Sequence, residues 1–338
     1  MTINSAAYLP AATKPLVVSE APYPTPNEDE IIVQNRAVAI NPIDVSIQLQ
    51  GTALFSWLPF PYILGFDCTG DVVALGSKVD TFKVGDRVVG QTPHAFQTYS
   101  PVPSHLATRI PESTRYEDAA VLPLCFFTAA VGLFGQDHLG LSYPELNTKP
   151  TGQTVLIWGG TTSVGSNAIQ LAVAAGYEVI STSSPKNFEY VKKLGASQVF
   201  DYNSPTVQAD IIAAFDGKQG AGALAIAGTD QDSRTKIVRS IYDIIRGVDG
   251  PKRVALSMPP PEEVPSDITA RFIDLFNLAE GRELGSALFN KYLSEALAAG
   301  TFIPSPPAEV VAKGLEGLQI GLDTCAKGVS AKKIVVTL

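Results

Sequence analysis

The amino-acid sequence predicts an α/β protein in which a doubly wound parallel sheet is joined to a second domain built mainly of strands. Three observations support this fold class. Apolar runs of strand length alternate with helical runs rich in small residues between about residues 154 and 256. Short β-branched runs separated by glycine and proline occupy the first 120 or so residues. The length of 338 residues suffices for about two domains.

The N-terminal part is expected to begin with short strands. Ile31–Val38 is a β-branched run that follows a polar, proline-rich turn, and Asp71–Leu75 is a second apolar run. Gly85-Asp86 forms a turn that leads into a further strand at Val88-Val89. Short strands separated by glycine- and proline-containing turns indicate a compact barrel or sandwich.

The pattern changes near Pro123, where strands begin to alternate with helices. Such alternation implies parallel strands joined by crossover helices on both faces of a sheet. The expected helices are Leu124–Phe134, Val164–Ala175 and Lys186–Leu194, and the expected strands are Thr154–Trp158, Glu178–Thr182, Val199–Tyr202, Ala223–Ala227, Lys252–Leu256 and Lys332–Leu338.

Composition and charge exclude several classes of function. With 45% hydrophobic and 17% charged residues, the chain is expected to form a packed core. A net charge of −8 argues against nucleic acid or an anionic membrane surface as a partner. No apolar run is long enough to span a membrane, no secretory signal is visible, and the three cysteines lie far apart. These features predict a cytoplasmic protein.

A glycine-rich loop follows the strand Thr154–Trp158 and leads directly into a helix. Glycines let the backbone approach a pyrophosphate closely, and the free N–H groups at the start of the helix then bind the anion. The alternative is a tight turn in an unrelated α/β protein. The residues expected to bind a dinucleotide here are Gly159, Gly160, Thr162, Ser163, Val164 and Gly165.

The end of the next strand indicates which nucleotide binds. An NAD site usually has a carboxylate at this point, whereas an NADP site has cations and hydroxyls for the 2′-phosphate. Ser183, Ser184, Lys186 and Asn187 follow this strand, and no carboxylate appears before Glu189. The sequence therefore predicts NADPH as the cofactor. The alternative is a serine-rich turn with a solvated lysine.

Several ordered motifs resemble those of the medium-chain dehydrogenase/reductases across almost the whole chain. They are Asn41-Pro42-Ile43-Asp44, Leu64-Gly65-Phe66-Asp67-Cys68-Thr69-Gly70, Phe82-Lys83-Val84-Gly85-Asp86-Arg87-Val88, Leu122-Pro123-Leu124 with Thr128-Ala129-Ala130, the Gly159–Gly165 loop, and Lys193-Leu194-Gly195-Ala196. Within this family, Ser184-Pro185-Lys186-Asn187-Phe188 and Asp201-Tyr202 are similar to the fungal quinone-reductase-like branch. That branch includes stand-alone enoyl reductases that act with polyketide synthases.

The resemblance implies a GroES-like β domain over residues 1–124 and 302–338 and a Rossmann NADPH-binding domain over 125–301, with the active site between them. It adds Tyr202, Ala227 and Met258 to the expected cofactor-binding residues. It also implies a small-molecule substrate, with a polyketide synthase or an acyl-carrier protein as a candidate partner. Either a monomer or a homodimer is compatible, the latter through an edge strand at Lys252–Met258.

The same resemblance predicts that the protein has no zinc. Zinc-dependent relatives have a cysteine, a His-Glu pair and a later cysteine as the catalytic ligands. This chain has Asn41 near the first position and Phe66-Asp67 at the second, and a phenylalanine cannot bind a metal. Cys125 lies near the third position, where a lone cysteine is more typical of a buried apolar residue.

Without zinc, the expected chemistry is hydride transfer from NADPH to an activated double bond, as in an enone or enoyl thioester, or to a quinone. The candidate catalytic residues are Asn41, Asp44, Ser46 and Thr128, and the candidate substrate-pocket residues are Thr52, Phe55, Trp57 and Tyr62. For Asp44, the alternative is a helix cap. Ser46 stands where the fungal enoyl reductases have lysine, which leaves the proton donor unidentified. A second hypothesis is therefore an NADPH-binding protein of the same fold without redox activity.

Overall fold

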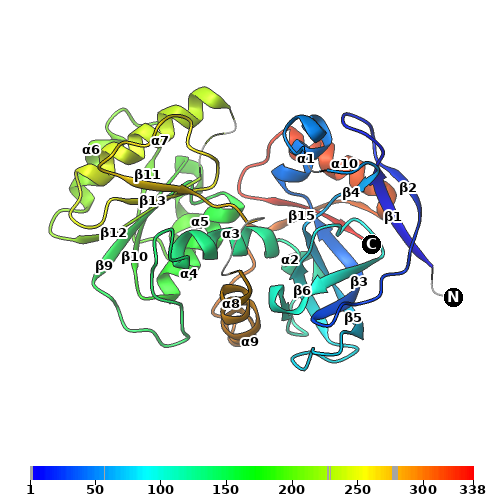
Figure 1. The fold of residues 1–338 in the computed structure, drawn as a ribbon. Helices are drawn as coiled ribbons and strands as arrows, with labels where there is room; N and C mark the ends of the chain where they lie inside the picture. The colour runs from blue at the N-terminus through cyan, green and yellow to red at the C-terminus, as the bar shows by residue number, and fades with distance from the viewer. Residues whose placement is uncertain (1–2, 57, 227, 229, 276–280) are drawn as a thin grey trace. The chain divides into compact units, whose positions relative to one another are not determined.

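The computed structural model describes residues 3–56, 58–226, 228, 230–275 and 281–338 (Figure 1). Contacts between Cα atoms divide the chain into two compact units. The first unit comprises Met1–Leu124 with Gly285–Leu338, and the second comprises Cys125–Leu284. Residues 285–301, expected from the sequence in the nucleotide-binding part, group with the first unit.

The first unit contains two sheets. A three-stranded sheet has the order β2-β1-β4, formed by Val17–Ala21, Asn4–Leu9 and Tyr62–Ile63. A larger sheet has the order β15-β16-β3-β5-β6-β8, formed by Ala308–Lys313, Lys333–Thr337, Glu30–Ala39, Asp67–Leu75, Arg87–Gln91 and Ala107–Arg109, and β7 (Tyr99–Pro103) also pairs with β3. The C-terminal strand β16 therefore lies beside β3, far away in sequence.

Helical segments surround these sheets. The core of the first unit is formed by buried aliphatic and aromatic side chains such as Ile31, Leu64, Phe96 and Val336. Helix α10 packs against α1 and against strands β15 and β16. The helical segments of this unit are α1 (Pro42–Gln50), η1 (Gly51–Ala53), η2 (Ser104–Leu106), α2 (Tyr116–Ala119), the π-helix η4 (Ser286–Leu293), α9 (Ser294–Ala299), η5 (Leu315–Gly317) and α10 (Leu318–Ala326).

The second unit is built on a six-stranded sheet in which every neighbouring pair is parallel. Its order is β11-β10-β9-β12-β13-β14, formed by Gln198–Asp201, Glu178–Ser183, Gln153–Trp158, Gln219–Ala225, Arg253–Leu256 and Thr269–Phe272. The chain adds strands on one side of β9 first and on the other side afterwards. The switch in direction therefore lies at β9, and the carboxyl end of such a strand is where ligands bind in open α/β sheets.

Helices cover both faces of this sheet (Figure 1). Leu156 and Trp158 of β9 pack in one apolar cluster with residues of α6 and α7, and Val155 and Ile157 are equally buried. Because successive strand residues point to opposite faces, the second pair supports the other layer. The fold class predicted from the sequence, a doubly wound parallel sheet with a GroES-like β domain, is confirmed. The helical segments are α3 (Pro123–Phe134), α4 (Ser163–Ala174), η3 (Pro185–Asn187), α5 (Phe188–Lys193), α6 (Val207–Ala214), α7 (Gln231–Arg246) and α8 (Gly281–Gly285).

One expectation about the sheet is wrong. Lys252–Met258 was the expected edge strand, but β13 (Arg253–Leu256) is covered by β14 (Thr269–Phe272) in parallel register. Among the described residues, β14 is the outermost strand on this side. Its four residues are mostly exposed and include an arginine, so it lacks the continuous apolar run that marks a buried strand.

The segment Tyr116–Phe134 is the one helical stretch in the described part of the chain that is long and apolar enough to cross a membrane. It is 78% buried inside the fold. Its hydrophobicity therefore matches that of a core helix.

Candidate nucleotide site and buried polar cluster

The glycine-rich loop of the second unit is hydrogen-bonded to the neighbouring strand β10. The Gly159 N–H donates to Thr182 Oγ1 at 3.0 Å, and the Gly160 N–H donates to the Thr182 carbonyl at 2.9 Å. Gly159 has a φ of +90°, a conformation that glycine adopts without strain. The chain thus turns sharply at the end of β9 before helix α4 begins.

Two further glycines are required by close packing. A Cβ atom on Gly160 would lie 2.4 Å from Ser181 Oγ, and one on Gly165 would lie 2.2 Å from the Gly159 carbonyl oxygen. Neither distance leaves room for a methyl group. Gly165 therefore lets the first turn of α4 lie directly against the loop, which is the packing that a dinucleotide fingerprint requires.

The start of α4 leaves main-chain donors available. Thr162 caps the helix, because its Oγ1 accepts the Gly165 N–H at 2.9 Å and donates to the Gly159 carbonyl at 2.9 Å. The N–H groups of Ser163 and Val164 donate to no acceptor within the described residues. Together with the positive end of the helix dipole, they form a site suited to a phosphate.

The end of β10 carries the hydroxyls and the cation predicted from the sequence. Ser183 is fully buried, and its hydroxyl donates to the Ser184 carbonyl at 3.0 Å. The Asn187 amide donates to Ser184 Oγ at 3.1 Å, while Lys186 is exposed. The turn thus presents Ser184 and Lys186 toward its surface.

Tyr202 lies at the same edge of the sheet. Strands β10 and β11 run parallel with Ser183 opposite Asp201, so the residue after each strand emerges side by side. The Tyr202 side chain is 44% exposed. The neighbouring Asp201 carboxylate accepts the main-chain N–H of Asn203 at 2.9 Å. This carboxylate therefore takes part in the turn that follows β11.

The structure describes one of the two remaining cofactor residues predicted from the sequence. Ala227 falls outside the described residues. Met258 is exposed in the loop after β13. Ile226, which follows strand β12, lies beside Gly159, with its Cβ 3.4 Å from where a Gly159 Cβ would be. The end of β12 therefore approaches the glycine-rich loop.

The first unit contains a buried polar cluster at Asn41. The Asn41 Nδ2 donates to Asp67 Oδ2 at 2.8 Å, and the Lys333 ammonium donates to Asn41 Oδ1. Lys333 Nζ also lies 3.3 Å from Asp67 Oδ2, and the side chains of this ion pair are 4% and 0% exposed. The other oxygen of Asp67 accepts the Leu124 N–H at 2.7 Å. We call Asn41, Asp67 and Lys333 the buried triad.

Asp44 lies beside the triad at the start of helix α1. Its Oδ2 accepts the Asn41 N–H at 2.8 Å, and its Oδ1 accepts the Gly65 N–H at 3.0 Å. Complete burial, together with the charge of Asp67, raises the pKa of Asp44 to about 7, although the two hydrogen bonds and Lys333 act in the opposite direction. These contacts describe the helix-cap alternative, and a catalytic role stays a prediction.

The remaining candidate residues have varied surroundings. Tyr62 is buried, with its ring against His94 at a centroid distance of 4.8 Å, and burial raises the pKa of its phenol to about 12. Ser46 on α1 and Phe55 are half-buried, and Thr52 is exposed. Trp57 lies outside the described residues. Thr128 is half-buried on α3 and belongs to the second unit.

The residues at the expected metal positions do not fit a zinc ion. The described part of the chain holds no group of three or more His, Cys, Asp or Glu side chains that could bind a metal. Asn41 and Asp67, two of the positions in question, both contact the Lys333 ammonium, and Phe66 has no donor atom. A second cation beside Lys333 would be repelled.

The triad contains two residues that the sequence did not single out. Lys333 was expected only as part of a C-terminal strand, and Asp67 only as part of a motif and at the second zinc position of the zinc-dependent relatives. Lysine is rarely buried without a partner. The signal available in the sequence was a lysine at the start of a strictly apolar run, Ile334–Val336, which places its side chain at the edge of a core.

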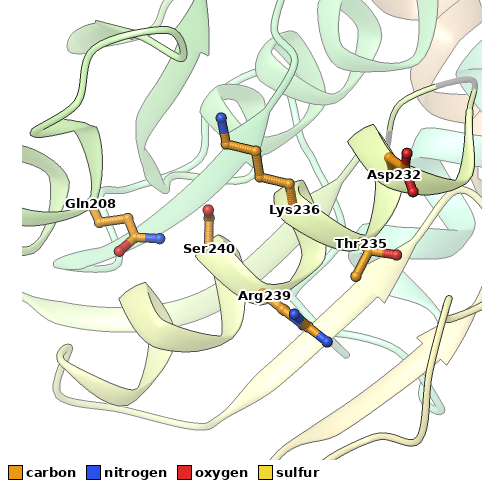
Figure 2. Close-up of a pocket in the computed structure, with 6 residues that line it drawn as sticks. All are labelled: Gln208, Asp232, Thr235, Lys236, Arg239 and Ser240. Carbon is orange, nitrogen blue, oxygen red and sulfur yellow. The ribbon is translucent and has the colours of Figure 1, made fainter.

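A separate pocket of about 430 Å³ lies in the second unit (Figure 2). Gln208 comes from α6 and the other lining residues come from α7: Asp232, Thr235, Lys236, Arg239 and Ser240. Arg239 forms a two-point ion pair with Glu262, at 2.7 and 2.6 Å. None of the cofactor residues predicted from the sequence lines this pocket.

Comparison with known proteins identifies relatives over the full chain. Residues 27–112 match the alcohol dehydrogenase GroES-like domain, and residues 163–238 match the zinc-binding dehydrogenase model. The chain is 48% identical to dehydrogenase azaJ of Aspergillus niger, covering 100% of both proteins. It is 39% identical to trans-enoyl reductase himH of Aspergillus japonicus, covering 99% of this chain and 98% of that protein. A mycobacterial protein solved in complex with NADPH, Rv1454c, shares the fold, with a TM-score of 0.72 and 21% identity over 100% of both chains.

Proposed function

The chain belongs to the medium-chain dehydrogenase/reductase family, in the branch of fungal dehydrogenases and trans-enoyl reductases, and from this premise we propose that it is an NADPH-dependent reductase that works without zinc. Its substrates are an activated double bond, in an enone or enoyl thioester, or a quinone. The observation that carries the proposal is the nucleotide edge of the second unit. There, a glycine loop and the N–H groups that begin α4 stand beside a turn bearing Ser184 and Lys186.

The cofactor is held by two groups of residues. The loop and the start of α4 bind the pyrophosphate through main-chain N–H groups, and the turn after β10 binds the adenosine 2′-phosphate. Ala227 and Met258 complete the set. The first group is Gly159, Gly160, Thr162, Ser163, Val164 and Gly165, and the second is Ser183, Ser184, Lys186, Asn187 and Tyr202.

NADPH supplies a hydride from its nicotinamide C4 when it is bound. The protein's own residues position the electron-poor carbon of the substrate and stabilise the charge that develops on its carbonyl oxygen. Asn41, Asp44, Ser46 and Thr128 are the proposed catalytic residues, and Thr52, Phe55, Trp57 and Tyr62 form the proposed substrate pocket. Tyr62 keeps its proton at neutral pH because its pKa is about 12, so it is able to donate a hydrogen bond to an enolate oxygen.

The proposed setting is fungal secondary metabolism. Two relatives with full or nearly full coverage are a dehydrogenase and a trans-enoyl reductase of Aspergillus species. The partner in this setting is a polyketide synthase or an acyl-carrier protein that presents a small-molecule substrate. We place the protein in the cytoplasm, as a monomer or a homodimer.

One observation favours a second candidate function. Ser46 is a half-buried residue of α1, and its hydroxyl is a poor acid compared with an ammonium group. A protein that binds NADPH but has no redox activity would need no proton donor at this position.

The test is consumption of NADPH by the purified protein, followed at 340 nm against a panel of quinones, enones and enoyl thioesters, both free and attached to an acyl carrier. The reductase proposal expects turnover with one of these classes. The variant Ser46→Lys is assayed beside the wild type, because it supplies an ammonium group where the wild type has a hydroxyl. If the wild type and Ser46→Lys both bind NADPH tightly but neither consumes it, the non-redox function is supported and the reductase proposal is contradicted.

A further inference from the structure

We propose that Lys333 and Asp67 are positioning residues that hold the Asn41 carboxamide in one fixed orientation for the substrate. The inference rests on the proposed function, since Asn41 is there a residue that contacts the substrate. It adds two residues, both outside the predicted site, to the machinery of the reaction. Lys333 and Asp67 act through Asn41 in this proposal, because their charged groups contact its carboxamide and each other.

The sheet brings the three side chains to one end of the first unit. Strand β3 lies between β16 and β5, with Ala39 opposite Val335 on one side and Asp67 on the other. The chain then leaves β3, with the Ile40 N–H donating to the Ile334 carbonyl at 2.9 Å, and reaches Asn41. Lys333 at the start of β16 and Asp67 at the start of β5 therefore flank Asn41.

An acceptor on one side and a donor on the other determine the orientation of the Asn41 carboxamide. Its Nδ2 faces a carboxylate oxygen that can only accept, and its Oδ1 faces an ammonium that can only donate. A rotation of the amide by 180° would place donor against donor and acceptor against acceptor. The ion pair thus selects one of the two amide orientations.

The main chain on both sides of this amide is fixed as well. The Asn41 N–H donates to Asp44 Oδ2 at 2.8 Å, and the same carboxylate accepts the Gly65 N–H at 3.0 Å. Asp67 in turn accepts the Leu124 N–H at 2.7 Å, so its carboxylate is itself held in place. Asp67 and Lys333 contact the two ends of the Asn41 carboxamide and therefore favour one rotation of its side chain.

Burial explains why the pair is coupled so tightly. With 0% and 4% side-chain exposure, neither charge is stabilised by bulk water. Removal of one partner leaves an uncompensated buried charge, whereas removal of both charges together is often tolerated. A purely structural ion pair would therefore be replaceable by neutral residues without loss of activity, and a positioning pair would not.

The experiment compares Lys333→Met, Asp67→Asn and the double variant in the full-length protein. Each single variant is expected to lower the urea midpoint of unfolding, and the double variant is expected to recover part of that loss, because it contains no unpaired buried charge. In the double variant, the new amide at position 67 keeps its oxygen on the Leu124 N–H, so its NH₂ group faces Asn41. The Asn41 carboxamide is then expected to turn over and accept from that group.

The changed orientation of the Asn41 carboxamide is expected to lower the kcat/KM of the double variant. The kcat/KM of the double variant for the acceptor stays at least about tenfold below that of the wild type, although the double variant is more stable than either single variant. The side-chain ¹⁵N–¹H signals of Asn41, assigned by NMR with Asn41→Asp, should shift in the double variant, and this measurement needs no turnover.

Two controls distinguish positioning from a general loss of stability or of nucleotide binding. Lys332→Met removes a neighbouring lysine whose ion pair with Glu309 is on the surface, and it should leave every measured quantity unchanged. NADPH affinity should be the same in all variants, since the nucleotide residues belong to the second unit.

Recovery of both stability and kcat/KM in the double variant would show that the pair serves stability alone and would overturn the inference. Unchanged Asn41 side-chain signals in the double variant would overturn it as well. If the wild type turns over no acceptor, the proposed function fails by itself, and the NMR comparison still decides whether Lys333 and Asp67 orient Asn41.

Discussion

Asp44 is enclosed completely in the first unit, and both of its carboxylate oxygens accept main-chain N–H groups. Tyr62 and Lys333 are buried in the same unit. For such residues, the environment matters more than the residue type. Burial raises the pKa of Asp44 and of Tyr62, so both groups bind their protons more tightly than they would in water.

Asp44→Asn is expected to change how stability depends on pH. The pKa of Asp44 is raised from 3.8 to about 7 on folding, so the folded protein binds this proton more tightly than the unfolded chain. The stabilising contribution is fully present below pH 3.8 and is lost as the pH rises through about 7. Asparagine cannot ionise, and it has one acceptor oxygen where Asp44 uses two, so the loss of one hydrogen bond also costs about 1 kcal/mol.

Urea unfolding of both proteins at pH 5, 6, 7 and 8 measures this effect. The variant is expected to be less stable at pH 5, and the difference from the wild type should narrow toward pH 7 and then stay constant. If the free energies of unfolding of the two proteins change in parallel between pH 5 and pH 7, Asp44 is ionised throughout this range. Its pKa is then not raised by burial.

At the scale of elements, the loop before α4 and the first turn of that helix act as one unit. Gly159 and Gly160 attach the loop to β10, and Gly165 lets the helix approach it. Thr162 satisfies one of the first N–H groups, which leaves those of Ser163 and Val164 for an anion. The binding capacity thus belongs to the backbone more than to any side chain.

Gly165→Ala should therefore damage nucleotide binding. The added methyl group would meet the Gly159 carbonyl oxygen at 2.2 Å, so the loop or the helix must shift. We expect a loss of about 1–3 kcal/mol in the free energy of unfolding, typical of overpacking, and a rise of at least about tenfold in the NADPH Kd, because the N–H groups are displaced.

Gly247→Ala is the matched control for this change. It adds the same methyl group in the same unit, at the end of α7, where the Cβ would lie 2.9 Å from the Ile212 side chain. It is expected to lower stability but to leave the NADPH Kd within about twofold of the wild type, since no phosphate-binding N–H group moves. Fluorescence titration gives the Kd values, and thermal unfolding gives the stability. Wild-type NADPH affinity in Gly165→Ala would contradict the assignment of this loop to the pyrophosphate.

Two elements that the sequence failed to predict share a physical cause. Strand β14 is short, exposed and polar, and α7 carries charged residues on most of its surface with only one apolar face. Patterns of continuous apolar residues are absent from both. Strands β9 and β12, by contrast, are buried on both faces and contain the apolar runs Val155–Trp158 and Ala223–Ala225.

At the scale of the whole molecule, the two units carry separate parts of the proposed reaction. The second unit contains the proposed nucleotide edge, and the first contains the buried triad and the proposed substrate-pocket residues. The tight turn between β9 and α4 could be predicted from the sequence, because its glycines are required by local backbone geometry. The triad could not, because Asn41, Asp67 and Lys333 meet only through the pairing of β16 with β3 and of β3 with β5.

In the proposed function, the second unit binds NADPH through the turn after β10. The most direct measurement is the ratio of NADH and NADPH dissociation constants for the wild type and for Lys186→Ala, by fluorescence titration at low salt. The account predicts at least about tenfold tighter binding of NADPH by the wild type, and a ratio that falls toward one in the variant while NADH affinity is unchanged, because only the 2′-phosphate contact is lost. Equal affinity of the wild type for the two nucleotides, or binding of neither, would contradict it.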